Sequence, residues 1–368
     1  MPYRNLELEI DTLLSDVVEH NASDLHLIPG HPPIFRVDGR LTPRDEHEIL
    51  SVDQIENIAQ IFLDAARYKV LQEKKEFDFS YSFKDSNRFR INAYYQKGVL
   101  ALALRFVPKT IRTIEELNLP PILTNFADRK QGLVLVVGPT GHGKSTTLAA
   151  MIDYINHNRA EHIITVEDPI EYLFTPQQSF IQQREVGLDT FSFANAIRAT
   201  LREDANVVMV GEMRDFESIS ATMTVAETGH LVFATLHTND AAQTIDRIID
   251  TFPPDQQQQI RAQLSATLVS IVSLRLLPQI GGGRVLATEV MIANDAVRNI
   301  IRENRTYEMI NTIHTGGQEG MISLDQSLAM LVAKRQVRIE DAKGYIQYPS
   351  VFEARLKGVS GGIPLNQE

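Results

Sequence analysis

The chain contains no cysteine among its 368 residues. Disulfide bridges, zinc sites built on thiolates and cysteine nucleophiles are therefore all excluded. A chain of this length is long enough for two or three domains, each with a core of its own, so it needs no covalent cross-link. The absence of cysteine agrees with a reducing compartment, and we expect a cytoplasmic protein.

Basic residues are in the minority, with 36 Lys and Arg against 47 Asp and Glu and a formal net charge of −11. Binding to nucleic acid depends on neutralising many phosphates, so this balance argues against a direct nucleic-acid partner. No apolar run approaches the ~20 residues that a bilayer-spanning helix needs. The start, MPYRNLELEIDTLL, is acidic and amphipathic, unlike a secretory signal. We expect no transmembrane segment.

Residues 1–107 alternate helical and strand patterns, which is typical of an α+β domain. The patterns predict a helix at 6–17, strands at 24–27 and 34–39, a helix at 52–63, and then three strands in FDFSYSF, RFRINAYYQ and VLALALRFV. Three strands in close succession favour an antiparallel sheet. A linker is predicted at 108–131, because Pro120 and Pro121 resist both helix and central strand.

Residues 132–357 have a different pattern, in which short apolar strands (LVLVV, HIITV, VVMV, LVFAT) alternate with helical segments. This is typical of an α/β core whose parallel sheet is covered on both faces. The segment PPDQQQQIRAQLSATLVSIVSLRLL is predicted as a long amphipathic helix or a helix pair. One more strand, RVLATEVMI, and a mostly helical C-terminal part follow, and residues 358–368 are predicted to be a flexible tail.

The stretch GPTGHGKS matches the phosphate-binding pattern G-x-x-x-x-G-K-[ST] in every fixed position, between an apolar strand and a predicted helix. Its glycines let backbone N–H groups turn toward phosphates, Lys144 neutralises their charge, and the Ser145 hydroxyl can bind Mg²⁺. His142 is expected to point to solvent while its backbone binds. The predicted nucleotide-binding residues are Gly138, Pro139, Thr140, Gly141, His142, Gly143, Lys144, Ser145 and Thr146.

Acidic residues follow two of the core strands, in HIITVEDPIEY and in VVMVGEMRD. Ligands of open α/β sheets lie beyond the carboxyl ends of the strands, so both groups are expected near the phosphates. Glu171 and Glu212 are the candidates for activating water and for supporting the metal. Asp215, just before a predicted helix, is expected to cap that helix.

Two histidines and two arginines are further candidates. His230 and His237 stand at the two ends of one strand, where a role in sensing the γ-phosphate and a purely structural role both remain open. In RFRINAYYQ, period-two alternation places Arg90 on one face, and the neighbouring strand can present Arg105 beside it. Spacing alone leaves these arginines as either surface residues or fingers that reach a nucleotide on another domain.

Taken together, the motifs resemble the type II/IV secretion ATPase superfamily, and most closely its PilT-type pilus retraction ATPases of twitching motility. The resemblance runs from Ala22 to Leu328. It is carried, in order, by ASDLHL, GPTGHGKSTTLAA, ITVEDPIEY, QREVG, GEMRD and AETGHLVFATLHTN. It implies a PAS-like N-terminal domain, a RecA-like P-loop ATPase core, and a homohexamer that binds ATP and Mg²⁺ at the junctions between subunits.

The resemblance also implies roles for single residues. Lys144 and Ser145 match the Walker A residues, Glu171 matches the glutamate that activates water, and Glu212 matches the Walker B glutamate near Mg²⁺. His230 and His237 match the His box. Arg90 and Arg105 match arginines that reach the nucleotide from the N-terminal domain, which decides the open question above in favour of fingers.

The same resemblance implies partners and a place in the cell. A retraction ATPase would act on a pilus platform protein in the inner membrane, from its cytoplasmic face at the pilus base, and a paralogous motor ATPase could assist it. Secretion and extension ATPases of the superfamily usually carry a four-cysteine zinc site and an additional N-terminal domain, neither of which is expected here. AVRNIIRE at 296–303 is similar to AIRNLIRE, the motif linked with retraction.

Two departures keep alternatives open. His142 stands where the family commonly has serine, and REDAN places Ala205 and Asn206 where a proline and an acid are common. We expect the second change to remove a carboxylate near the site. The change at Ala205 and Asn206 leaves a nucleotide-binding accessory subunit with little turnover as one alternative function. A RecA-like DNA translocase, which shares the P-loop, and a secretion or extension ATPase of the same superfamily are the others.

Overall fold

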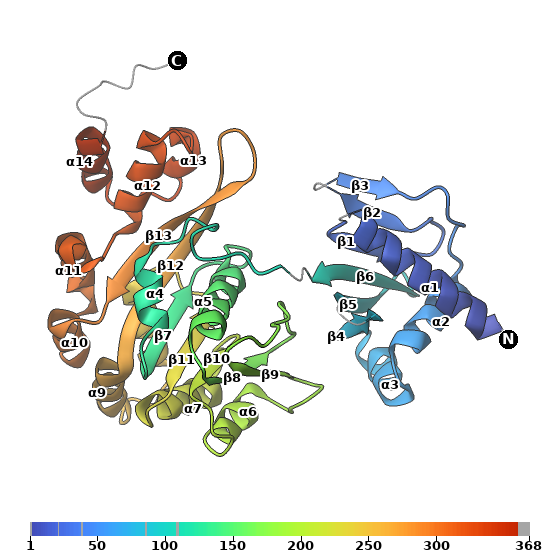
Figure 1. Ribbon diagram of the computed structural model, residues 1–368, viewed down its shortest axis with the longest axis horizontal. Helices are drawn as coiled ribbons and strands as arrows, with labels where there is room; N and C mark the ends of the chain where they lie inside the picture. Colours follow the sequence, from blue (N-terminus) through green and yellow to red (C-terminus); the bar gives the residue numbers. More distant parts are fainter. Residues whose placement is uncertain (1, 21, 38–39, 85–86, 108–109, 360–368) are drawn as a thin grey trace. The chain divides into compact units, whose positions relative to one another are not determined.

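The computed structural model describes residues 2–20, 22–37, 40–84, 87–107 and 110–359. They divide into two compact units, each described here by itself (Figure 1). Unit 1 consists of Met1–Thr110 with Pro169–Leu173, and unit 2 of Ile111–Asp168 with Phe174–Glu368. Within the described ranges, no helix combines the length and the apolar character needed to cross a bilayer. The predicted tail lies, from residue 360 onward, outside the described residues.

Among its described residues, unit 1 has an antiparallel six-stranded sheet, in strand order β3-β2-β1-β6-β5-β4, and three α-helices. Its elements are α1 (Pro2–Glu19), β1 (Asp24–Leu27), β2 (Ile34–Val37), β3 (Arg40–Pro43), α2 (Val52–Phe62), α3 (Ala65–Lys74), β4 (Glu76–Phe83), β5 (Asn87–Gln96) and β6 (Val99–Val107). The α+β prediction and its three C-terminal strands are confirmed.

The core of unit 1 follows from the alternation along β6. Leu100, Leu102 and Leu104 are fully or almost fully buried, and they share one hydrophobic cluster with residues of α1 and α2. Helix α2 begins with a capping box. The Ser51 hydroxyl accepts a hydrogen bond from the backbone amide of Gln54, and the Gln54 side-chain oxygen accepts one from the backbone amide of Ser51. The opposite face of the sheet carries the polar residues Arg90, Asn92 and Arg105 beside alanines.

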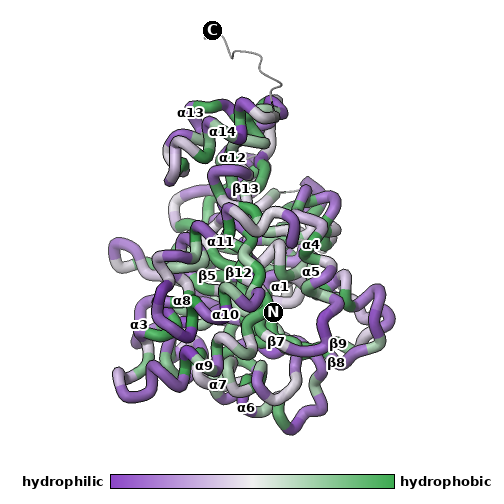
Figure 2. The backbone as a smooth tube through the Cα atoms, turned by 90° about the vertical axis from the view of Figure 1, so that its left-hand side faces the viewer, coloured by the Kyte–Doolittle hydropathy of each residue, from purple (hydrophilic) through white to green (hydrophobic). Residues whose placement is uncertain are grey.

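Unit 2 is built on a seven-stranded sheet of order β13-β12-β7-β11-β10-β8-β9, in which only the β12–β13 pair is antiparallel. Its strands are β7 (Gly132–Val137), β8 (His162–Glu167), β9 (Phe180–Glu185), β10 (Val207–Val210), β11 (Leu231–Leu236), β12 (Leu268–Pro278) and β13 (Arg284–Ile292). Figure 2 shows the hydrophobic colour along β7 and β12, which lie inside the sheet. The predicted α/β core is confirmed.

Both faces of this sheet are covered, because successive residues of β7 enter different hydrophobic clusters. Leu133 and Leu135 pack with α6 to α10, whereas Val134 and Val136 pack with α4 and α5. The helices are α4 (Ile122–Ala127), α5 (Lys144–Asn158), α6 (Phe193–Thr200), α7 (Phe216–Glu227), α8 (Ala241–Asp250), α9 (Gln257–Thr267), α10 (Asp295–Arg302), α11 (Met309–Thr315), α12 (Leu324–Ala333), α13 (Ile339–Lys343) and α14 (Pro349–Val359).

The long helix predicted after Phe252 is wrong in its second half. Helix α9 ends at Thr267, and the eleven residues that follow form β12 between β7 and β13. A central strand is buried on both sides, so its sequence, LVSIVSLRLLP, lacks the alternation that distinguishes a half-buried strand from a buried helix.

The segment predicted as a linker, 108–131, carries structure of its own. It contains α4, and Leu123 and Phe126 of that helix are buried in the cluster that α5 also joins. From Ile111 onward the segment belongs to unit 2. The two prolines do resist a strand, but Pro121 lies directly before the first residue of α4, a position where a missing N–H costs nothing.

The C-terminal helices α12, α13 and α14 gather around the far ends of β12 and β13. Leu277 and Val285 of these strands share a cluster with buried residues of α12 and with Tyr345 after α13. In Figure 1 these helices lie beside the loop that joins β12 to β13. This arrangement places the C-terminal part near the carboxyl half of β12.

Candidate functional site

The phosphate loop, which we define as residues 138–143, connects β7 to α5 and uses glycine for three left-handed backbone positions. Gly138, Gly141 and Gly143 have φ values of 145°, 79° and 86°. A Cβ on Gly138 would lie 2.7 Å from the Leu274 carbonyl oxygen, so that glycine also permits close contact with β12. The loop therefore curves tightly into the N-terminus of α5, where anions bind readily.

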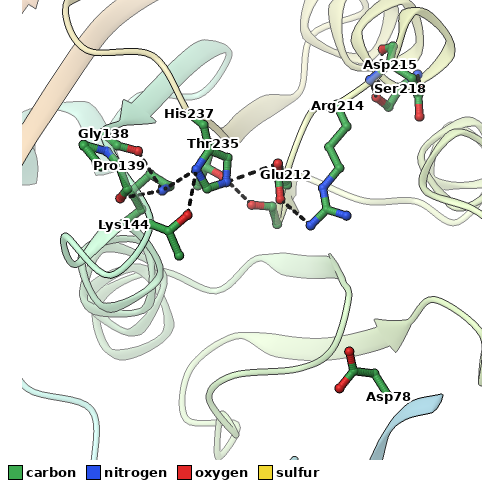
Figure 3. Close-up of polar contacts among 12 residues, drawn as sticks. Asp78, Gly138, Pro139, Lys144, Glu212, Arg214, Asp215, Ser218, Thr235 and His237 are labelled. Atoms are coloured by element: carbon green, nitrogen blue, oxygen red, sulfur yellow. Dashed lines mark hydrogen bonds and ion pairs between the residues drawn. The ribbon is translucent and has the colours of Figure 1, made fainter. Parts of the chain in front are cut away.

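Lys144 is buried at the start of α5, and its ammonium group is held by the loop itself. Its Nζ donates to the carbonyls of Gly138, at 2.8 Å, and Pro139, at 3.0 Å. It also lies 3.4 Å from Nδ1 of His237, the residue after β11 (Figure 3). An ammonium group only donates, so Nδ1 accepts here, and the ring proton is assigned to Nε2.

Glu212, two residues after β10, continues this chain of contacts. One carboxylate oxygen lies 3.2 Å from Nε2 of His237, and the other lies 2.7 Å from the Arg214 guanidinium. Burial alone would raise the pKa of Glu212, but Arg214 and His237 together hold it below its usual value. The carboxylate is therefore charged at neutral pH.

These contacts bring together residues from the carboxyl ends of three neighbouring parallel strands, β7, β11 and β10. Figure 3 shows Lys144, His237, Glu212 and Arg214 in one row. Glu212 was expected near the phosphate loop, and His237 connects it to Lys144 there. Arg214 is not among the residues predicted from the sequence. Its position two residues after Glu212, at the end of a predicted strand, could have indicated it.

Asp215 caps a helix, as predicted. Its Oδ1 accepts the amide of Ser218 at 2.7 Å, and the Ser218 hydroxyl accepts the amide of Asp215, which makes a capping box at the start of α7. The pair lies away from the row of Lys144, His237 and Glu212 (Figure 3). Asp215 is therefore accounted for by local structure.

The loop that carries His237 is anchored from the antiparallel end of the sheet. Arg275 of β12 donates to the carbonyl oxygen of Asn239, at 3.0 Å, and to its side-chain oxygen, at 2.9 Å. Glu289 of β13 accepts the first amide of α8, from Ala241, at 2.9 Å. Both anchors were missed from the sequence, because nothing in it relates β12 and β13 to this loop.

Glu289 gives the fold a predicted pH dependence. Burial raises its pKa from the usual 4.5 to about 7, against the opposing effect of the Ala241 amide. A carboxyl group whose pKa is higher in the folded than in the unfolded protein stabilises the folded state fully only below the unfolded pKa of 4.5. This stabilisation is lost as the pH rises through the folded pKa of about 7. Glutamine cannot titrate, so we expect the free energy of unfolding of Glu289→Gln to rise by about 2–3 kcal/mol relative to that of the wild type between pH 5 and pH 8. Denaturant unfolding of both proteins across this pH range measures the difference. A difference in unfolding free energy that stays constant with pH would refute the prediction.

His142 does not point to solvent, so this prediction is wrong. Its Nδ1 accepts the backbone amide of Leu276 on β12, at 3.1 Å. Its ring also meets Tyr345 edge-on, with 6.5 Å between the ring centroids. The prediction failed because the neighbour is brought close by the fold and lies 134 positions away in the chain.

Asn206 lies far from the phosphate loop, which corrects a second expectation. It precedes β10 and its side-chain oxygen accepts the amide of His162 at the start of β8, at 2.8 Å. Glu212 lies beyond the other end of β10, and the four residues of this strand alone span about 13 Å. The change at Ala205 and Asn206 therefore removes no carboxylate from the Lys144 end of the sheet.

His230 stands at the amino end of β11, where its Nδ1 lies 3.1 Å from the Val225 carbonyl oxygen and 3.2 Å from the Thr228 hydroxyl. Within unit 2 it does not join His237, so any role at a nucleotide stays a prediction. Glu171 is an exposed residue in the connection from β8 to β9, and it groups with unit 1. Its role in activating water also stays a prediction.

Arg90 and Arg105 lie side by side in unit 1, where the register of β5 and β6 pairs them directly. Arg105 binds Asp24 through Nε at 2.8 Å, yet its side chain is 70% exposed, and Arg90 lies 3.9 Å from Asp78. The predicted geometry of two neighbouring arginines is confirmed. The Arg90 side chain is 39% exposed, and the role of both arginines at a nucleotide stays a prediction.

The residues around the phosphate loop also fit a magnesium ion. Glu212 offers a charged carboxylate and Ser145 a hydroxyl at the start of α5, and these are oxygen ligands of the kind Mg²⁺ prefers. Both Glu212 oxygens already have partners, so contact through water fits better than direct ligation. Mg²⁺ commonly keeps several waters in protein sites.

Comparison with known proteins gives a consistent result. The sequence model of the family described as "Type II/IV secretion system protein" matches residues 4–282. The type IV pilus retractation ATPase PilT of Pseudomonas aeruginosa is 44% identical over 349 residues, covering 94% of this chain and 100% of that protein. The type IV pilus ATPase PilU of the same organism is 40% identical over 351 residues, covering 95% and 92%.

A solved structure is similar over nearly the whole chain. The crystal structure of the pilus retraction motor PilT with bound ADP has 45% sequence identity and a TM-score of 0.87, covering 94% of this chain and 99% of that one. This similarity extends over both units.

Proposed function

The chain belongs to the type II/IV secretion system protein family, and on this premise we propose that it is a Mg-ATP-hydrolysing motor that powers retraction of type IV pili. PilT relatives at this identity over most of the chain support ATPase activity and a role in retraction. The structural observation that carries the proposal is the row of Lys144, His237, Glu212 and Arg214 at the carboxyl edge of the sheet.

Each residue of this row has a proposed task. Lys144 would exchange the two loop carbonyls for phosphate oxygens, which are stronger acceptors for an ammonium group. His237 would couple phosphate binding at Lys144 to the position of Glu212, because one of its ring nitrogens contacts Lys144 and the other contacts Glu212. Mg²⁺, held near Ser145 and Glu212, would neutralise the phosphate charge.

Glu171, Arg90 and Arg105 would complete the site in a ring of subunits. Glu171 would take the proton of the attacking water. Arg90 and Arg105, exposed and side by side, would stabilise the transferring phosphate of a neighbouring subunit. Activity would then require a homohexamer, because one chain would not supply all the groups to one nucleotide.

We further propose that the ring works at the cytoplasmic face of the inner membrane, on a platform protein at the pilus base. A paralogous motor ATPase is a possible companion, and the similarity to PilU keeps the alternative of an accessory subunit open. Against that alternative, the contacts among Lys144, His237 and Glu212 are intact, and Asn206 lies at the other end of the sheet.

Pilus dynamics in cells that lack the chain test the function. We expect such cells to assemble pili but not to retract them, and the wild-type chain but not Glu212→Gln to restore retraction. Normal retraction without the chain would support an accessory subunit instead. Loss of the pili themselves would support an extension ATPase.

A further inference from the structure

Strand β12 extends beyond the end of β7, and the phosphate loop packs against this extension. Its pairing with β7 ends where Ser273 meets Val137, although β12 continues to Pro278 with β13 along its other edge. The Leu274 carbonyl oxygen lies against Gly138, and the Leu286 side chain lies 3.6 Å from where a Cβ of Gly143 would be. The loop thus packs against the continuation of β12 and against Leu286 of the neighbouring β13.

The amide of Leu276 would have no strand partner on that edge. Alternate amides of a strand point to opposite sides, and this one points away from β13, past the end of β7. His142 supplies the missing acceptor through Nδ1, at 3.1 Å. A half-buried N–H without an acceptor would cost free energy, so this bond favours one position of the loop.

We infer that His142 is a positioning residue, which fixes the phosphate loop on β12 in the curvature that binds phosphate and links the loop to the C-terminal helices. A loop with three left-handed glycines has many other conformations, and ordering it would otherwise reduce nucleotide affinity. The link to the helices is Tyr345, whose ring meets that of His142. The inference rests on the proposed nucleotide site.

The surroundings keep the His142 ring in the form that can accept. Burial lowers its pKa most, and the charges of Arg275 and Lys144 lower it further. A neutral ring with its proton on Nε2 leaves Nδ1 free to accept the Leu276 amide. Arg275 itself anchors Asn239, so the loops that carry His142 and His237 are both fixed to β12.

Two matched variants test the inference. In His142→Asn the side-chain oxygen takes the place of Nδ1, whereas His142→Leu has similar bulk and no acceptor. We expect the dissociation constant of a fluorescent ADP analogue to rise about fivefold to tenfold in the leucine variant and less than about twofold in the asparagine variant. Hydrogen exchange of the peptide that contains Leu276, in nucleotide-free protein, should speed up only in the leucine variant.

The outcomes separate the two hypotheses. A wild-type chain without affinity for ADP would overturn the proposed function and the inference with it. Tight binding by the wild type together with unchanged binding by His142→Leu would overturn only the inference. Equal weakening in both variants would also overturn it, because the loss would then follow the imidazole ring and not the acceptor atom.

Discussion

Glu212→Gln is expected to lower ATP turnover by about 100-fold to 1,000-fold while the protein still folds. Glutamine keeps the shape and one acceptor oxygen but loses the charge that Arg214 and His237 hold in place. The Mg²⁺ ion, which would neutralise the developing phosphate charge, would then lack the carboxylate proposed to support it. Steady-state phosphate release at saturating ATP and Mg²⁺ measures the effect.

A matched control separates this effect from a general change of charge. Glu217→Gln removes an exposed carboxylate in the first turn of α7, five residues along the chain, and should leave turnover within about twofold of the wild type. Equal ATP turnover in Glu212→Gln and the wild type would exclude a role of Glu212 in hydrolysis.

Glu171→Gln is expected to reduce turnover by about 100-fold to 10,000-fold and to leave ATP binding close to that of the wild type. Glutamine cannot accept the proton of the attacking water, whereas the phosphate loop and Lys144 are untouched. Single-turnover hydrolysis and equilibrium ATP binding should be measured on the same preparation. Weakened binding with an unchanged hydrolysis rate would instead indicate that Glu171 contacts substrate and is not the base.

The parallel core of unit 2 was predictable because its strands are short, apolar and separated by helical segments. The predicted strands LVLVV, HIITV, VVMV and LVFAT correspond to β7, β8, β10 and β11. Two strands were not predicted. β9, FIQQRE, is a polar strand at the edge of the sheet, and β12 is a buried run whose period does not distinguish strand from helix.

The candidate site was predictable where it depends on strand ends, and unpredictable where it depends on tertiary contacts. Lys144, Glu212 and His237 meet because parallel strands bring their carboxyl ends to one edge. The partner of His142, by contrast, is a backbone amide on β12, a strand whose sequence predicts a helix. Asn206 was misplaced because its motif was assigned to the wrong end of β10.

The most direct test of a ring motor is ATP turnover by the wild-type chain as a function of protein concentration, with oligomer size followed in parallel. The account predicts little turnover per chain at concentrations where monomers dominate, and a cooperative rise as hexamers form. Full turnover by monomers would contradict a site shared between subunits. Intact hexamers that bind ATP tightly but hardly hydrolyse it would contradict the motor itself.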